Sequence, residues 1–146
     1  MLFDQDFSPK PFDPMVAYGM SKTALIYMAI EIHRRFGQQG IQCFAVHPGG
    51  VKNSMYERLD PSVAAYMIQK YWTRMKSPAQ GAATSVWAAF SQAASAYTGR
   101  YLEDCSVAEP VGESFDDLSP GYAQWAYDGE AAKKLWDATL AMIAMK

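Results

Sequence analysis

The run of residues from Pro14 to Ile30 holds a single charged side chain, Lys22, among apolar, aromatic and small residues. Asp13, directly before this run, can accept hydrogen bonds from free backbone amides, and proline is favoured at the first helical position. The pattern therefore predicts a long helix that begins at Pro14 and closes at Gly37 or Gly40. A helix that is apolar on nearly all sides packs on more than one side, so the chain must provide cover for it.

The rest of the chain predicts short strands alternating with further helices. The expected elements are, in chain order, a buried strand at 41–48, helical structure within 54–76, a helix opening at Ser77-Pro78, a short strand at 99–102 and a helix at 128–145. This order predicts an α/β protein with a parallel sheet. Two strands are a small sheet for three long helices.

Length and composition narrow the class of protein. The chain has 146 residues, half of them hydrophobic, which predicts one globular domain. A net charge of −2 argues against a nucleic-acid partner. Two cysteines, Cys43 and Cys105, predict free thiols in a reducing compartment. The sequence suggests neither a signal peptide nor a membrane span, so we expect a cytoplasmic protein without a membrane partner and without a metal site.

A tyrosine and a lysine lie four residues apart in the first predicted helix. Tyr18 and Lys22 share one helical face, one turn apart. Lysine is almost never buried without a partner, and an ammonium group beside a tyrosine favours the phenolate form. The pair predicts a general acid/base, Tyr18, with Lys22 as its electrostatic helper. The alternative is a lysine that extends to solvent beside a core tyrosine.

The same spacing recurs at Tyr66 and Lys70, so the spacing alone does not identify a site. The first pair differs in its context, because the strand that follows its helix ends in a Pro-Gly-Gly turn at 48–50. In parallel α/β sheets, ligands bind beyond the carboxyl ends of strands, where glycines let the backbone approach a cofactor. Pro-Gly-Gly is equally typical of a simple tight turn. The combination of the pair with this turn favours Tyr18 and Lys22, rather than Tyr66 and Lys70, as the catalytic pair.

The sequence AYGMSKTA at 17–24, followed by HPGGV at 47–51, resembles the short-chain dehydrogenase/reductase family, most of all its fungal retinol-dehydrogenase-like members. GRYLEDCSVAEP at 99–110 and AYDGEAAKKLWD at 126–137 resemble the tail of that subgroup. The resemblance implies the C-terminal part of a Rossmann-like, doubly wound parallel sheet with few strands and about three to five helices. It also implies a single partial domain over 1–146, with a lead-in loop at 1–13, a variable substrate lobe at 54–76 and a surface loop at 104–121.

The resemblance also implies roles for individual residues. Tyr18 is expected to be the catalytic acid/base, and Lys22 to bind the hydroxyls of the nicotinamide ribose of NAD or NADP. Ser21 is expected to be structural. The turn after the strand is expected to lie against the nicotinamide; its cofactor-binding residues are Pro48, Gly49, Gly50, Val51 and Asn53. Residues of the 54–76 lobe are expected to line a pocket for a small-molecule substrate, or else to belong to the core; they are Met55, Tyr56, Tyr66 and Trp72.

One departure from the family bears on function. The ten glycines never occur in the G-x-G spacing, so the dinucleotide fingerprint is absent. The chain is therefore expected to be a truncated relative of NAD(P)-dependent alcohol or carbonyl oxidoreductases. Two alternatives remain: a repurposed enzyme that carries out a non-redox isomerisation or cyclisation, and an oligomeric binding or scaffold protein.

The first helix also predicts self-association. Apolar residues lie on its Tyr18 side, including Met15 and Leu25, and on the opposite side, including Val16 and Met28. Gly19 within the helix costs about 1 kcal/mol relative to alanine, which predicts close backbone approach. One side can cover the strand at 41–47, and the other is expected to pack against a second copy in a homodimer or larger assembly.

Overall fold

The computed structural model describes residues 12–113, 115–116 and 118–144. The chain divides into two compact units. Unit 1 comprises Met1–Ala45, Tyr97–Tyr101 and Ala123–Lys146, and unit 2 comprises Val46–Ala96 and Leu102–Tyr122. Residues 1–11 of the expected lead-in loop lie outside the described part. The expectation of a single domain over the whole chain remains a prediction.

Unit 1 is built on the long helix α1, Pro14–Phe36. The Asp13 carboxylate accepts hydrogen bonds from the backbone amides of Met15, at 2.8 Å, and Val16, at 3.1 Å, which satisfies amides that lack helical partners. Gly37 is the C-cap, and the short 3-10 helix η1, Gly37–Gln39, leads to Gly40 in the left-handed region at φ 83°. The predicted boundaries of this helix are confirmed.

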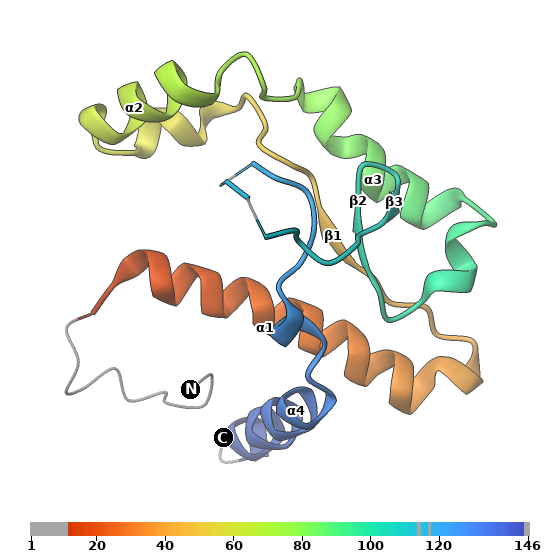
Figure 1. The fold of residues 1–146 in the computed structure, drawn as a ribbon. Helices are drawn as coiled ribbons and strands as arrows, with labels where there is room; N and C mark the ends of the chain where they lie inside the picture. Colours follow the sequence, from red (N-terminus) through yellow and green to blue (C-terminus); the bar gives the residue numbers. More distant parts are fainter. Residues whose placement is uncertain (1–11, 114, 117, 145–146) are drawn as a thin grey trace. The chain divides into compact units, whose positions relative to one another are not determined.

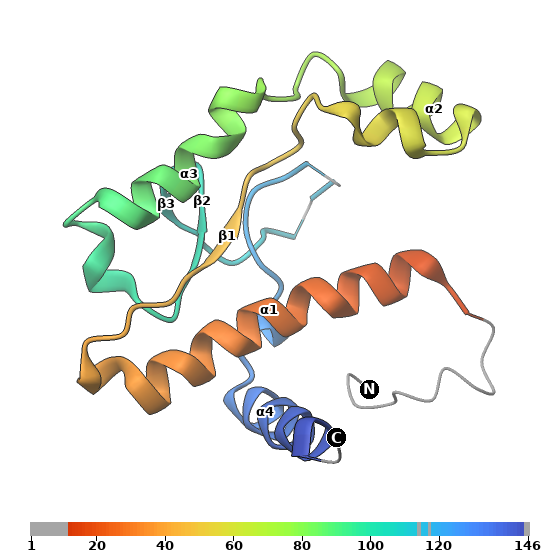
Figure 2. The ribbon, with the colours of Figure 1, turned by 180° about the vertical axis from the view of Figure 1, so that it is seen from behind.

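Helix α1 packs against α4, Gly129–Ala144, and against the short 3-10 helix η4, Gln124–Tyr127. The two long helices cross within unit 1 in Figures 1 and 2. The contact buries Tyr27, whose hydroxyl donates a hydrogen bond of 2.8 Å to the Trp125 carbonyl, and it also buries Ala29 and Ala132. The chain therefore covers part of α1 with its own C-terminal helix.

A charged cluster joins α1 to α4. The Glu31 side chain is 1% exposed and accepts hydrogen bonds from Arg34 and Arg35, which lie three and four residues further along α1. Arg35 also pairs with Asp137 of α4 at 3.4 Å and lies over the Trp136 ring, 4.9 Å from its centroid. Burying the Glu31 carboxylate removes it from water, and the ion pairs with Arg34 and Arg35 offset this loss of hydration.

The sheet has three short strands in the order β1-β2-β3. They are β1, Ala45–His47; β2, Tyr101–Glu103; and β3, Ser106–Val107. Backbone hydrogen bonds between 43 and 99 and between 45 and 100 advance in the same direction along both segments, as in parallel alignment. Strand β3 pairs antiparallel with β2, with Leu102 opposite Val107 and Glu103 opposite Ser106.

Two features of the sheet differ from the sequence-based expectation. The first strand begins at Ala45 rather than Ile41, because the Cys43 amide donates to the Thr98 side-chain hydroxyl at 3.0 Å instead of to a neighbouring backbone. The segment expected to be a surface loop at 104–121 contains β3 and an isolated bridge between Pro110 and Tyr122. The fold remains α/β, as predicted.

The helices of unit 2 follow β1. They are the 3-10 helix η2, Ser54–Arg58; α2, Pro61–Tyr71; and α3, Pro78–Phe90, followed by the 3-10 helix η3, Ala94–Tyr97. Helix α3 begins with the predicted serine cap and proline, and Ser77 and Gln80 complete a capping box. A parallel bridge between Val51 and Lys76 closes the base of the segment that contains η2 and α2. The segment expected to form a lobe at 54–76 is thus helical, and the bridge brings its two ends together.

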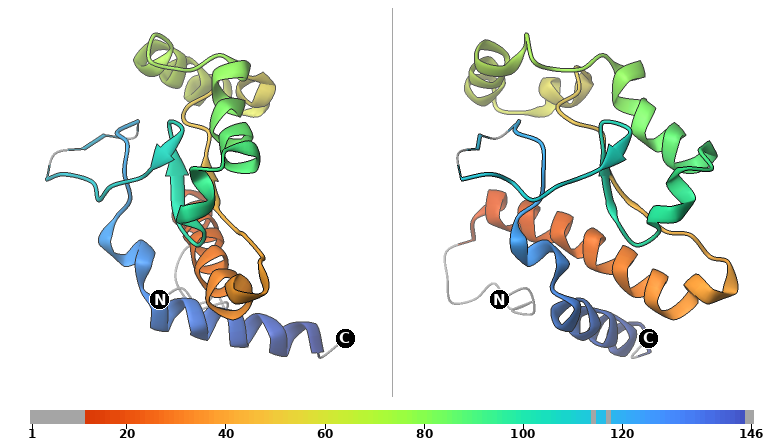
Figure 3. Two further views of the ribbon diagram at one scale, coloured as in Figure 1. Left: turned by 90° about the vertical axis from the view of Figure 1, so that its right-hand side faces the viewer. Right: turned by 45° about the vertical axis from the view of Figure 1, so that its right-hand side comes forward.

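A two-residue turn joins β2 to β3 beside α3, as Figure 3 shows. Its central residues, Asp104 and Cys105, have φ values of 48° and 55°. Two successive positive values are what a tight hairpin turn requires, but they cost a cysteine on the order of 1 kcal/mol or more. The Cys105 amide donates to the hydroxyl of buried Thr84 on α3 at 3.2 Å, and this contact holds the turn in place.

Three smaller observations concern predictions made from sequence. Both cysteines are free thiols. No helix in the described part of the chain is long and apolar enough to cross a membrane. A Cβ built on Gly19 meets no atom within 4 Å, so the expectation of close backbone approach there is wrong for the described residues. The glycine lies on an open helical surface instead.

Candidate active site

Tyr18 and Lys22 lie one turn apart on α1, as predicted, and both are exposed. The Lys22 Nζ atom lies 5.2 Å from the centroid of the Tyr18 ring, which is a cation–π contact rather than a hydrogen bond to the phenol. Ser21 donates its hydroxyl proton to the Tyr18 carbonyl at 2.7 Å, which is a local helix contact. The Tyr18 side chain, 58% exposed in unit 1, is open to a substrate.

The second Tyr-x-x-x-Lys pair lies on α2 in unit 2. Here Lys70 Nζ donates a hydrogen bond of 2.9 Å to the Tyr66 hydroxyl. The pKa of Lys70 is raised, first by this bond and then by a bond to Tyr71. Lys70 Nζ also lies 5.3 Å from the Tyr66 ring centroid, so the two pairs differ in the hydrogen bond to the tyrosine hydroxyl, which Lys70 makes.

The turn after β1 brings together the residues expected to face a nicotinamide. Gly49 has a φ of 80°, a backbone conformation that favours glycine, and a Cβ built on it would lie 2.8 Å from Lys76 Nζ, so a larger residue would displace the end of the Lys76 side chain. Val51 packs against Gly81 of α3, where a Cβ would lie 2.5 Å from a Val51 methyl carbon. Asn53 caps η2 by accepting from the Met55 amide at 2.9 Å. Val51 and Asn53 therefore have structural roles here.

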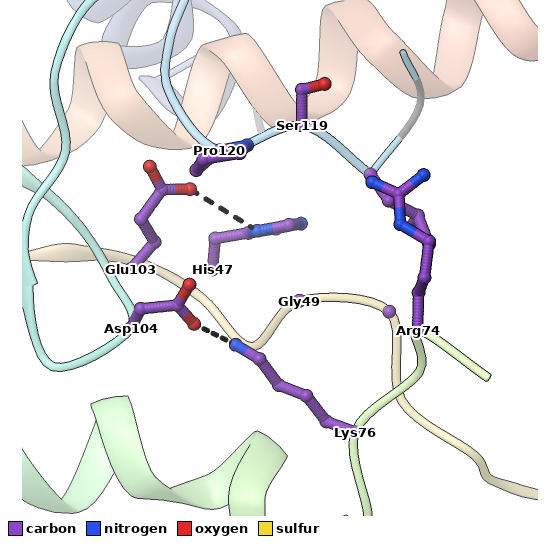
Figure 4. A pocket seen from close by; sticks show the side chains of 10 residues that line it. His47, Gly49, Arg74, Lys76, Glu103, Asp104, Ser119 and Pro120 are labelled. Carbon is purple, nitrogen blue, oxygen red and sulfur yellow. Dashed lines mark hydrogen bonds and ion pairs between the residues drawn. The ribbon is translucent and has the colours of Figure 1, made fainter. Parts of the chain in front are cut away.

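A pocket of about 150 Å3 opens beside this turn within unit 2. It collects side chains from the β1 turn, the α2–α3 connection, the β2–β3 hairpin and the segment at 118–120 (Figure 4). Its lining residues are His47, Gly49, Gly50, Arg74, Lys76, Glu103, Asp104, Leu118, Ser119 and Pro120. Gly49 and Gly50 are the members of this set that the sequence singled out as cofactor-binding.

Burial and charge set the protonation of the acids and bases in this pocket. Burial lowers the pKa of the His47 imidazole, and the Lys76 charge acts in the same direction while Asp104 opposes it. Burial raises the pKa of the Glu103 carboxyl, against a hydrogen bond from the Gly121 amide. The His47 Nδ1 and Glu103 Oε2 atoms are 4.0 Å apart, and Asp104 forms an ion pair with Lys76. Both pKa shifts act toward the neutral forms of His47 and Glu103.

The residues expected to bind substrate lie in unit 2 but do not line this pocket. Met55 and Tyr66 are exposed, Tyr56 is half-buried, and Trp72 lies under Lys52, whose Nζ is 4.7 Å from a ring centroid. Sequence reasoning missed Lys76, Glu103 and Asp104. Glu103 and Asp104 follow the short strand predicted at 99–102, so the rule that ligands bind beyond strand ends was a usable signal.

The chain is similar to several known oxidoreductases. It is 41% identical over 137 residues to the short-chain dehydrogenase/reductase prx1 of Penicillium roqueforti, covering 90% of this chain and 39% of that protein. It is 32% identical over 142 residues to the oxidoreductase calI of Penicillium decumbens, covering 92% and 41%. It is 37% identical over 142 residues to a probable oxidoreductase of Streptomyces lividans, covering 92% and 47%. No family model matches the chain. The chain spans less than half the length of these relatives.

Proposed function

We propose that this chain, which belongs to the short-chain dehydrogenase/reductase family, carries the proton-transfer residues of an NAD(P)-dependent alcohol or carbonyl oxidoreductase. The observation that carries the proposal is the exposed Tyr18 hydroxyl with Lys22 one turn away on α1, in a chain 41% identical to a short-chain dehydrogenase/reductase over 90% of its length.

Tyr18 is the general acid/base of this proposal. In carbonyl reduction its hydroxyl donates a proton to the carbonyl oxygen, and in alcohol oxidation its phenolate takes the proton from the substrate hydroxyl. The Lys22 ammonium favours the phenolate electrostatically. Lys22 can approach the phenol oxygen by a side-chain rotation, because both groups are exposed on the same helical face.

The residues present fit the nicotinamide end of NAD(P) only. In unit 1 the exposed Lys22 ammonium is a suitable donor for ribose hydroxyls. In unit 2, taken by itself, the backbone at Gly49 is suited to close contact with a planar ring. When bound, the nicotinamide supplies or accepts a hydride. The G-x-G spacing that lets a backbone cradle pyrophosphate is absent from the sequence, so we infer that these 146 residues alone bind NAD(P) weakly.

Two measurements test this proposal. Turnover of NADH and NADPH with a panel of aldehydes and ketones, at high cofactor concentration, is expected to reveal carbonyl reduction. Titration calorimetry with both cofactors is expected to give dissociation constants weaker than about 100 μM. Binding at micromolar concentration or tighter would refute the inferred absence of the pyrophosphate site. Absence of any redox turnover would favour the non-redox or scaffold alternatives.

A homo-oligomer is also part of the proposal. Within unit 1, α1 buries Tyr27, Ala29 and Glu31 but is exposed at the apolar residues Met15, Val16, Leu25 and Met28. Exposed apolar patches of this kind usually mark an interface, and a two-fold self-contact is the commonest form. Light scattering after size exclusion is expected to give at least twice 16.2 kDa. A monodisperse monomer at micromolar concentration would contradict the assembly without affecting the chemistry of Tyr18.

A further inference from the structure

The pocket of unit 2 has two cations on one wall, and each has hydrogen-bond donors to spare. Arg74 pairs with Asp116, with two nitrogen–oxygen distances of 2.5 and 3.3 Å, and Lys76 pairs with Asp104. A guanidinium has five N–H donors and an ammonium three, so each cation can bind a further acceptor without releasing its partner. Ser119 donates to Asp116 at 3.0 Å, which fixes the position of this acid. The ion pairs with Asp116 and Asp104 therefore fix the positions of Arg74 and Lys76.

Two apolar side chains also line the pocket, beside the polar side chains of His47, Glu103 and Ser119. Leu118 and Pro120 line it, and a Leu118 methyl carbon lies 3.0 Å from where a Cβ on Gly50 would stand. Figure 4 shows the His47 ring extending from beside Glu103 toward Arg74. A cavity of about 150 Å3 is known to accept a molecule the size of benzene. The space therefore suits a small ligand with one anionic end and a short hydrocarbon end.

We propose that this pocket binds a short-chain carboxylate with roughly six heavy atoms or fewer, such as propionate or butyrate. Lys76 Nζ and the Arg74 guanidinium hold the carboxylate oxygens, and Leu118 and Pro120 lie along the alkyl chain. Charge-assisted hydrogen bonds to two cations supply the specificity for the anionic end. The pocket shares the Gly49–Gly50 turn with the proposed nicotinamide contact, but it uses neither Tyr18 nor Lys22, and its test needs no cofactor.

The affinity of the pocket for a carboxylate is expected to depend on whether Glu103 is protonated. Asp104 and Asp116 already balance Lys76 and Arg74, so a second carboxylate would be repelled by an ionised Glu103. A protonated Glu103, favoured by burial, instead offers an O–H donor to the ligand. The charged groups that face Glu103 are His47, at 4.0 Å, Asp104 and Lys76, and the Gly121 amide donates to it. Affinity is therefore expected to fall as pH rises through the pKa of Glu103.

Titration calorimetry with propionate and butyrate, at a series of pH values at which both ligands are ionised, tests the proposal. We expect millimolar binding at the acidic end that weakens about tenfold or more at the alkaline end. Lys76→Met is expected to weaken binding about tenfold, and Lys76→Arg to retain it. Lys133→Met is the matched control, because Lys133 also pairs with an aspartate, Asp137, at 2.9 Å, but in unit 1. Thermal melts establish that each variant is folded.

The Glu103→Gln variant separates the pH dependence of carboxylate binding from the binding itself. It keeps the size of the side chain and removes its charge, so affinity at alkaline pH is expected to rise toward the acidic value. An unchanged pH dependence in Glu103→Gln would assign the coupling to His47 and overturn the role of Glu103. No binding of either carboxylate at tens of millimolar, or an equal loss in Lys133→Met, would overturn the site. Tighter binding of inorganic phosphate than of butyrate would overturn the carboxylate class.

Discussion

The helices α1 and α2 each carry a Tyr-x-x-x-Lys pair, and the two pairs are arranged differently. In α2 the Lys70 ammonium donates to the Tyr66 hydroxyl at 2.9 Å, whereas in α1 the Lys22 ammonium lies 5.2 Å from the Tyr18 ring centroid. By local geometry alone, the α2 pair is the better lysine–phenol contact. Similar exposure, 58% for Tyr18 and 53% for Tyr66, does not separate them either.

The difference teaches that a shared spacing does not define a catalytic pair. The Lys70 ammonium donates to a lone pair of the Tyr66 oxygen, which leaves the Tyr66 O–H free to donate, so this contact does not by itself exclude an acid/base role. An ammonium over the ring leaves the Tyr18 hydroxyl available, with no hydrogen-bond partner among the described residues. What favours α1 is its context, in which the following strand ends at the Gly49–Gly50 turn.

Replacing each lysine in turn is expected to give the largest contrast. Lys22→Met removes the charge that favours the Tyr18 phenolate and the donor for the ribose, so kcat/KM for carbonyl reduction should fall about 100-fold or more. Lys70→Met removes a contact within α2 and should leave kcat/KM within about threefold of the parent. Steady-state kinetics with NADH and NADPH measures both. Equal losses in the two variants would remove the distinction between the helices.

The anchoring of α1 predicts a stability effect that α2 does not share. Glu31→Gln removes the charge that Arg34 and Arg35 pair with and should lower the free energy of unfolding by about 1.5 kcal/mol, because both arginines keep access to solvent. Glu109→Gln, at an exposed position, is the control and should change it by less than about 0.5 kcal/mol. Urea denaturation measures the difference, and similar values for the two variants would contradict the buried cluster.

The same carboxylate gives a pH dependence of known sign. The hydrogen bond from Arg34 lowers the pKa of Glu31 below its ordinary value of 4.5, so the folded state favours the ionised form. This contribution to stability is present above the unfolded pKa and is lost as pH falls through the folded pKa. The parent protein should therefore lose more stability than Glu31→Gln on acidification below about pH 4. Denaturation midpoints across that range measure it, and parallel losses would contradict the pKa shift.

Gly19 beside Tyr18 gives the smallest expected effect. A Cβ there meets nothing within 4 Å, so Gly19→Ala should stabilise α1 by about 0.5–1 kcal/mol through helix propensity. Thermal denaturation measures this gain. A loss of stability instead would mean that another surface packs against Gly19 in the assembled protein, which would support the original expectation of close approach.

The sequence was most informative where local rules decide structure. Asp13 before a proline and Ser77-Pro78 with Gln80 fix two helix starts through side-chain caps, which need no tertiary information. The β2–β3 hairpin was missed because Asp104-Cys105 is not a usual turn pair; its backbone depends on a contact with Thr84 on another element. The pocket was missed for the same reason, since Lys76 and Glu103 meet only through folding.

The most direct test of the account compares Tyr18→Phe with Tyr66→Phe in one assay of NAD(P)-dependent carbonyl reduction. Each change removes only a hydroxyl, and circular dichroism should show the fold retained in both. We predict that Tyr18→Phe lowers kcat by about 100-fold or more, while Tyr66→Phe keeps the kcat of the parent, because only α1 is followed by a strand that leads into the Gly49–Gly50 turn. Equal losses in the two variants, or full activity in Tyr18→Phe, would contradict the assignment of Tyr18 as the acid/base.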